Sequence, residues 1–173
     1  MKDKAFTSLA FLLISTVFCG CFYAGYKPVY EYDLDIEPVP GKGNICIAVM
    51  RNSSSSGIRI QTRTGFETER NAYHNWVIEP GALVSNALNR ALCRDGVKPA
   101  IVLRGEIECF EADMTNRVFR FSGFYSENRS ADKIRFDMTA PLRGSSPAAV
   151  VLSATECVRR LAARMNSYGK PAK

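Results

Sequence analysis

Three stretches in the C-terminal half decide the fold: IVLRGEIEC at 101–109, RVFRFSGFY at 117–125 and KIRFDMT at 133–139. Apolar and polar residues alternate in each, which is typical of a β-strand with one buried and one solvated face. The connections at 113–116 and 126–131 are short and polar, so we expect antiparallel strands joined as hairpins. The predicted buried faces carry Ile101, Leu103, Gly105, Ile107, Cys109, Phe119, Phe121, Gly123, Tyr125, Ile134, Phe136 and Met138.

Two segments with helical periodicity flank these strands. The first begins at Glu79-Pro80-Gly81, where proline suits the first turn of a helix and an acid suits its positive end, and we expect it to end at Asp95-Gly96. The second is predicted over 147–166. Apolar residues recur at spacings of three and four in both, at Leu83, Val84, Ala87, Leu88, Ala91 and Leu92 and at Val151, Ala154, Val158, Leu161, Ala162 and Met165.

The N-terminal half adds further strands. Residues 29–34 alternate like a half-buried strand, whereas ICIAVM at 45–50 is continuously apolar and predicts a central strand buried on both faces. Residues 58–64 and 67–72 predict an exposed hairpin around Gly65. The predicted fold class is therefore α+β, a two-layer sandwich of two amphipathic helices packed on a mostly antiparallel β-sheet.

The N-terminus carries a targeting signal. Lys2 and Lys4 precede an uncharged run at 5–18, which is too short to span a bilayer and is typical of a bacterial secretory signal. Cys21 follows Gly20 in a pattern that resembles a lipobox, so we predict acylation of its thiol. The alternative is an ordinary cleaved signal or an uncleaved anchor.

The predicted organisation follows from that site. Residues 1–20 form a lipoprotein signal peptide, 21–28 a lipidated tether, 29–166 an α+β domain and 167–173 a C-terminal tail. The formal charge of +6 is spread along the 173 residues without a basic run. This pattern favours mild affinity for anionic surfaces such as lipid headgroups and argues against nucleic-acid binding.

The remaining cysteines, at 46, 93, 109 and 157, stand singly without a C-x-x-C pair, so zinc binding is not expected. We expect Cys46, Cys93, Cys109 and Cys157 to be buried thiols, because free cysteine is among the most buried residue types. One or two disulfides are the alternative, since an exported protein meets an oxidising compartment. Their pairing cannot be read from the spacing.

No catalytic or metal-binding residue is predicted. The chain has one histidine, His74, and no G-x-S-x-G motif, so we expect His74 to pack or face solvent. No glycine-rich phosphate loop of a standard type occurs. Glu106, Glu108 and Glu111 are expected to form a solvated strand face.

The segment 57–78 is the candidate partner-binding surface. Arginines alternate there with apolar and aromatic residues, and both kinds are enriched at protein interfaces. The predicted binding residues are Ile58, Arg59, Arg63, Tyr73 and Trp76. The alternative is that Trp76 simply caps the core beside the first helix.

The layout resembles the ABC-type transport auxiliary lipoproteins, the outer-membrane-anchored partners of MCE-type (mammalian-cell-entry) lipid transport systems. The resemblance rests on the lipobox at Cys21, the strand with Tyr32-Asp33-Leu34, the strand at 45–50 before Gly57-Ile58-Arg59-Ile60, and Trp76 leading through Pro80 into a Leu-rich helix. It spans residues 21–166. Ile58-Arg59 stands where family members often carry Tyr-Arg.

This resemblance implies a non-enzymatic role in intermembrane lipid transport, with no cofactor besides the covalent lipid on Cys21, whose acyl chains include palmitate. The implied partners are a periplasmic MCE-domain protein and an ABC permease and ATPase. The implied location is the outer membrane facing the periplasm, where some members form homo-oligomeric rings. Phe22, rather than Asp, follows the lipidated cysteine, which agrees with sorting to that membrane.

Two alternatives stay open. The chain could be an outer-membrane assembly lipoprotein that partners a β-barrel, like those of lipopolysaccharide assembly, which share the plan of two helices on a sheet. It could also be a lipid-anchored hydrolase, which would need His74 as its base.

Overall fold

The computed structural model describes residues 27–39, 45–93, 96–128 and 130–168. The predicted signal peptide and Cys21 lie outside the described residues. The elements are β1 (Tyr30–Tyr32), β2 (Ile45–Asn52), β3 (Arg59–Thr64), β4 (Glu67–Trp76), α2 (Pro80–Leu92), β5 (Ile101–Asp113), β6 (Val118–Glu127), β7 (Ile134–Pro141) and α3 (Pro147–Tyr168).

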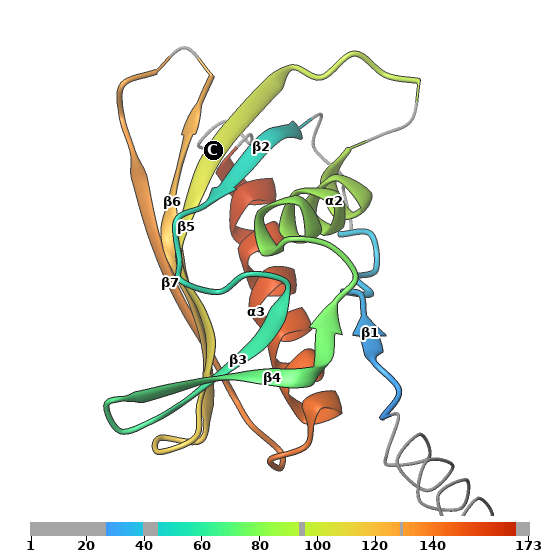
Figure 1. Ribbon diagram of the computed structural model, residues 1–173. Coiled ribbons are helices and arrows are strands. Elements are labelled where there is room, and N and C mark those ends of the chain that lie inside the picture. Colours follow the sequence, from blue (N-terminus) through green and yellow to red (C-terminus); the bar gives the residue numbers. More distant parts are fainter. Residues whose placement is uncertain (1–26, 40–44, 94–95, 129, 169–173) are drawn as a thin grey trace, which may run out of the picture.

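The strands form one seven-stranded sheet in the order β1-β4-β3-β5-β6-β7, with β2 also paired to β5. The hairpins β3–β4, β5–β6 and β6–β7 are antiparallel, whereas β1–β4, β2–β5 and β3–β5 are parallel. Both helices lie on the same side of the long strands β5, β6 and β7 (Figure 1). The predicted α+β class is confirmed, with a mixed sheet.

Both predicted helices are present, and their apolar stripes face the sheet. Glu79 caps α2, because its carboxylate accepts hydrogen bonds from the backbone N–H groups of Gly81 and Ala82 at 2.9 and 3.1 Å. α2 ends at Leu92, earlier than the predicted Asp95-Gly96, since Cys93 has extended dihedrals. All six predicted apolar residues of α2 are buried, as are Ala154, Val158, Leu161, Ala162 and Met165 of α3.

The aromatic centre of the core joins residues of β4, β5 and β6. The ring of Phe110 is 5.3 Å from that of Trp76, 4.9 Å from Phe119 and 5.4 Å from Phe121, measured between centroids. The contacts of Phe110 with Phe119 and Phe121 are edge-to-face, and such contacts add to the stabilisation from burial of apolar area. The predicted buried faces of β6 and β7 are thus confirmed at Phe119, Phe121, Tyr125 and Phe136.

A β-bulge in β5 corrects the prediction for Cys109. Ile107 pairs with Gly123, yet Cys109 pairs with Ser122, so an extra residue interrupts the ladder. Because a bulge shifts the alternation by one residue, Phe110 takes the core face and Cys109 turns to the other. Gly123 permits this approach, since a Cβ there would lie 2.0 Å from the Glu106 carbonyl oxygen.

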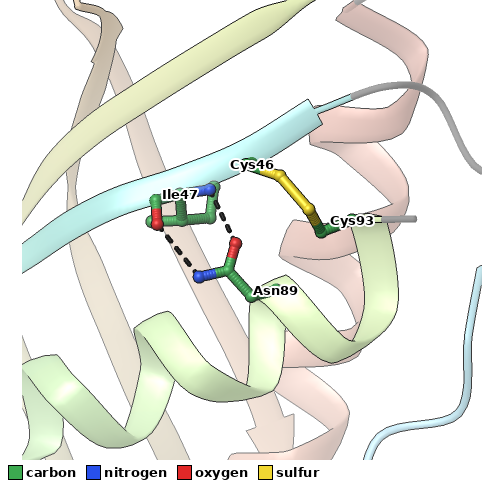
Figure 2. The surroundings of a disulfide bond; sticks show 4 residues. All are labelled: Cys46, Ile47, Asn89 and Cys93. Carbon is green, nitrogen blue, oxygen red and sulfur yellow. Dashed lines mark hydrogen bonds between the residues drawn. A yellow bond between two sulfur atoms is a disulfide. The ribbon is translucent and has the colours of Figure 1, made fainter. Parts of the chain in front are cut away.

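The strand β2 is not buried on both faces, contrary to the prediction. It pairs with β5 alone, and Val49 is 40% exposed. Its other edge faces α2, whose Asn89 side chain donates to the Ile47 carbonyl at 2.9 Å and accepts from the Ile47 N–H at 2.8 Å (Figure 2). Ser85 Oγ accepts from the Met50 N–H at 2.9 Å. Helix side chains therefore occupy the place of a neighbouring strand.

Replacing Asn89 with alanine leaves the N–H and the carbonyl of Ile47 without these partners. We expect the free energy of unfolding to fall by about 1–3 kcal/mol, the cost of unsatisfied buried polar groups. Asn86→Ala is the matched control, because Asn86 is an exposed residue of the same helix. Urea unfolding of both variants tests this, and equal midpoints would contradict it.

A disulfide joins Cys46 at the start of β2 to Cys93 at the end of α2, with their Cα atoms 5.1 Å apart and a sequence separation of 47 (Figure 2). The expectation of four thiols is therefore wrong for this pair. Cys109 is half-buried and free, and Cys157 is buried and free. Asn89 and Ser85 hold α2 along β2, which brings the two distant cysteines together.

Candidate functional site: the β3–β4 hairpin

The turn of the β3–β4 hairpin presents an aromatic side chain to solvent. Thr64 pairs with Glu67, so Gly65 and Phe66 form a two-residue turn. Gly65 adopts φ +61°, a left-handed conformation that favours glycine. Its N–H donates to Thr115 Oγ1 at 2.7 Å, which fastens the hairpin to the β5–β6 turn. Phe66 itself is fully exposed.

A buried carboxylate fixes the middle of the hairpin. Glu111 is 5% exposed and accepts hydrogen bonds from Arg63 and, at 3.1 Å, from Gln61 Nε2. Arg120 Nη1 lies 3.9 Å from the same carboxylate. The expectation that Glu111 faces solvent is wrong, because the bulge in β5 and the parallel pairing of β3 bring arginines and the carboxylate together.

Hydrogen bonding and burial in this cluster shift the pKa values of its side chains. The hydrogen bond to Glu111 raises the pKa of the Arg63 guanidinium. Burial, with the neighbouring Glu111 carboxylate, raises the pKa of the Cys109 thiol to about 11. Cys109 is therefore a protonated thiol at neutral pH and a poor nucleophile. The cluster stiffens the hairpin and does not offer an activated side chain.

A bulge in β4 divides the candidate surface into two parts. Gln61 pairs with Arg70 but Arg59 pairs with Asn75, so β4 contains more residues than β3 between these two pairs. Asn71 Oδ1 accepts from the N–H groups of Tyr73 and His74 at 3.0 and 3.2 Å. Beyond the bulge, β4 turns to pair in parallel with β1. Tyr73 consequently belongs to the β1 edge and not to the hairpin turn.

The predicted binding residues do not form one surface. Ile58 and Arg59 are exposed at the base of the hairpin, and Arg63 is paired with Glu111. Trp76 is 2% exposed and packs on Phe110, which fits the alternative expectation that it caps the core.

Phe66 is exposed at the turn, although it is not among the five predicted binding residues. The sequence carries a signal for this exposure, because a large apolar residue beside glycine in a two-residue turn has no strand face on which to bury itself.

His74 packs among tyrosines. Its ring stacks on Tyr30 and Tyr32, with centroids 5.1 and 5.8 Å apart, and its Nδ1 is 2.9 Å from the Tyr32 hydroxyl oxygen. The base of a hydrolase needs a nucleophile within hydrogen-bond reach. The expectation of a packing role fits these contacts.

A pocket of about 570 Å³ lies between the end of β7 and the start of α3. Leu152 and Arg143 line it, with Glu156 as its acidic residue. Hydrogen bonds from Arg159 and Arg160 lower the pKa of Glu156. Its carboxylate is thus ionised at neutral pH and suited to an ion pair rather than to general acid chemistry.

Within the described ranges, the structure contains no group of three or more potential metal ligands. Across these same ranges, neither α2 nor α3 combines the length with the apolar character that a bilayer-crossing helix needs.

Comparison with known proteins finds solved structures that share this fold. No family model and no curated protein matches the chain. A solved structure of an uncharacterized protein matches with a TM-score of 0.66 and 11% identity, covering 83% of this chain and all of that chain (100%). A Xanthomonas campestris protein of the DUF330 family matches with a TM-score of 0.59 and 14% identity, covering 79% of this chain and 91% of its own. The chain therefore shares its α+β fold with solved structures that include a DUF330 protein.

Proposed function

We propose that this protein is a non-enzymatic lipoprotein that serves as an auxiliary component of an ABC-type, MCE-linked system for intermembrane lipid transport. Cys21 carries the lipid and anchors the domain at the outer membrane, facing the periplasm. The partners are a periplasmic MCE-domain protein and the permease and ATPase of the system, and the protein assembles as a homo-oligomeric ring.

The hairpin turn is the observation that carries the proposal. Phe66 is fully exposed at the end of an element that Thr115 and Glu111 fasten to the sheet. Exposing a phenylalanine to water is unfavourable by about 2–3 kcal/mol relative to burying it. A rigid element that displays such a side chain fits a protein partner with a complementary pocket.

Two further observations support an envelope protein. The lipobox-like pattern at Cys21 predicts a lipid anchor. The disulfide between Cys46 and Cys93 suits an oxidising compartment such as the periplasm. The shared fold with the DUF330 structure agrees with this assignment at the level of architecture.

A crosslinked pull-down from envelope membranes, identified by mass spectrometry, tests the proposal. We expect the wild type to recover an MCE-domain protein and a permease, and Cys21→Ala to recover less of both. Phe66→Ser should weaken recovery about 30-fold if Phe66 is a binding anchor worth about 2 kcal/mol. Leu152→Ser is the matched control, because Leu152 is an equally apolar exposed residue on α3.

The other outcomes are distinct. Recovery of a β-barrel without an MCE protein would contradict the proposal and favour the assembly lipoprotein. Recovery of neither, with Cys21 unmodified by mass, would contradict both functions.

A further inference from the structure

Four residues form an exposed patch at the β1 edge of the sheet, which we call the tyrosine edge: Lys27, Val29, Tyr30 and Tyr73. Val29 and Tyr30 are each 51% exposed and Tyr73 is 41% exposed. The Lys27 ammonium lies 5.1 Å from the centroid of the Tyr73 ring. The patch thus combines two amphipathic rings, an aliphatic side chain and a cation.

The fold sets the positions of both rings. Tyr30 pairs with His74 across the β1–β4 ladder and stacks on its ring. Tyr73 lies in the bulge of β4, where Asn71 Oδ1 holds its N–H. Bulges re-aim side chains, and this one directs Tyr73 away from the β3 ladder. The pairing of β1 with β4 and the bulge in β4 therefore fix the positions of the tyrosines in the tyrosine edge.

The chain enters the fold at this patch. Six residues lead from Cys21 to Lys27, and an extended chain of that length spans at most about 21 Å. A lipid on Cys21 therefore keeps Lys27 within that distance of the bilayer. Tyrosine is enriched at membrane interfaces, where its ring meets acyl chains and its hydroxyl meets water. A lysine beside it extends its stem along apolar surface and its ammonium toward phosphate.

We infer that the tyrosine edge rests on the outer membrane, with Tyr30 and Tyr73 at the boundary of headgroups and acyl chains. This inference rests on the proposed lipid anchor. The anchor supplies attachment, and the edge supplies orientation. In Figure 1 the hairpin turn lies on the opposite side of the molecule from β1. An edge-down orientation thus leaves Phe66 clear for a protein.

The charge near the patch predicts which lipids matter. Lys27 is a cation, and the exposed Glu31 of β1 carries the opposite charge. Asp33, further along, pairs with Arg90 at 3.4 Å. Because these positive and negative charges offset one another, we expect the insertion of the two tyrosine rings into the bilayer interface to dominate the contact with the membrane. We expect the contact to be equally strong on vesicles with and without phosphatidylglycerol.

Fluorescence quenching tests the inference on the mature, lipidated protein. The parent has one tryptophan, Trp76, which is buried and gives a constant background. Tyr30→Trp and Tyr73→Trp place reporters in the patch, and Leu152→Trp places a matched reporter on exposed α3. Each protein is reconstituted in phosphatidylethanolamine vesicles that contain phospholipid brominated on the upper acyl chain. We expect quenching and a blue shift for the two patch reporters and neither for Leu152→Trp.

Flotation of the vesicles separates this inference from the anchor. Protein that floats with the vesicles while both patch reporters stay unquenched would overturn the inference and leave the anchor standing. Protein that does not float, with Cys21 unmodified, would overturn the two together. Unquenched Tyr30→Trp and Tyr73→Trp reporters, together with loss of a pulled-down protein partner in a separate Tyr30→Ser, Tyr73→Ser variant, would assign the edge to that partner and overturn membrane contact.

Discussion

A variant in which Cys46 and Cys93 are both alanine is expected to unfold with a free energy about 4 kcal/mol lower than the parent. The disulfide closes a loop of 47 residues, and the chain-entropy model gives about 4 kcal/mol for a loop of that length. Native stabilities of about 5–15 kcal/mol make this a large fraction. Urea unfolding followed by circular dichroism measures it, and we expect a marked drop in the transition midpoint.

Cys109→Ala is the control for the loss of a cysteine. Cys109 is half-buried and free, so its replacement leaves the disulfide intact and should move the midpoint little. A reducing agent should lower the midpoint of the parent and of Cys109→Ala, but not that of the double variant. An unchanged midpoint in the double variant would show that the pairing of β2 with α2 does not need the disulfide.

Trp76→Ala is the second change with a large expected effect. Trp76 is almost completely buried against Phe110, and replacing a buried tryptophan with alanine costs about 3–5 kcal/mol through lost transfer energy and a cavity. We expect a loss of stability of that size in urea unfolding.

Trp76→Phe is the matched variant. The indole Nε1 is buried and has no hydrogen-bond partner within the described residues. Phenylalanine fills much of the same volume and removes that unsatisfied donor, so the expected cost is below about 1.5 kcal/mol. Full stability of Trp76→Ala together with lost partner recovery would instead make Trp76 a binding residue.

These variants distinguish residues that stabilise the core from exposed residues that are proposed to bind a partner or the membrane. The disulfide, Asn89 and Trp76 hold β2, α2 and β4 in place. Phe66 and Tyr30 are exposed at the margins of the same sheet. Changes at the first group should lower stability, whereas changes at the second should alter binding and leave stability nearly unchanged.

The sequence by itself determined the elements whose signals are local. Alternation located β5, β6 and β7, and the spacing of apolar residues located α2 and α3. Gly65 placed the hairpin turn because only a residue that tolerates positive φ suits that position. The periodicity with which side chains point to one face is set by the local backbone geometry of a helix or strand, so the sequence pattern reveals it without knowledge of distant contacts.

Only the tertiary structure decided which segments meet. The parallel pairing of β2 with β5 and the union of Cys46 with Cys93 join residues about 50 positions apart. The bulge after Ile107 turned Cys109 outward, and it set Glu111 among arginines. Trp76 is part of the core because it packs on Phe110 of β5, while Phe66 and Tyr73 are exposed at a turn and a bulge. Burial depends on what packs against a side chain, and residues far apart in sequence supply that packing.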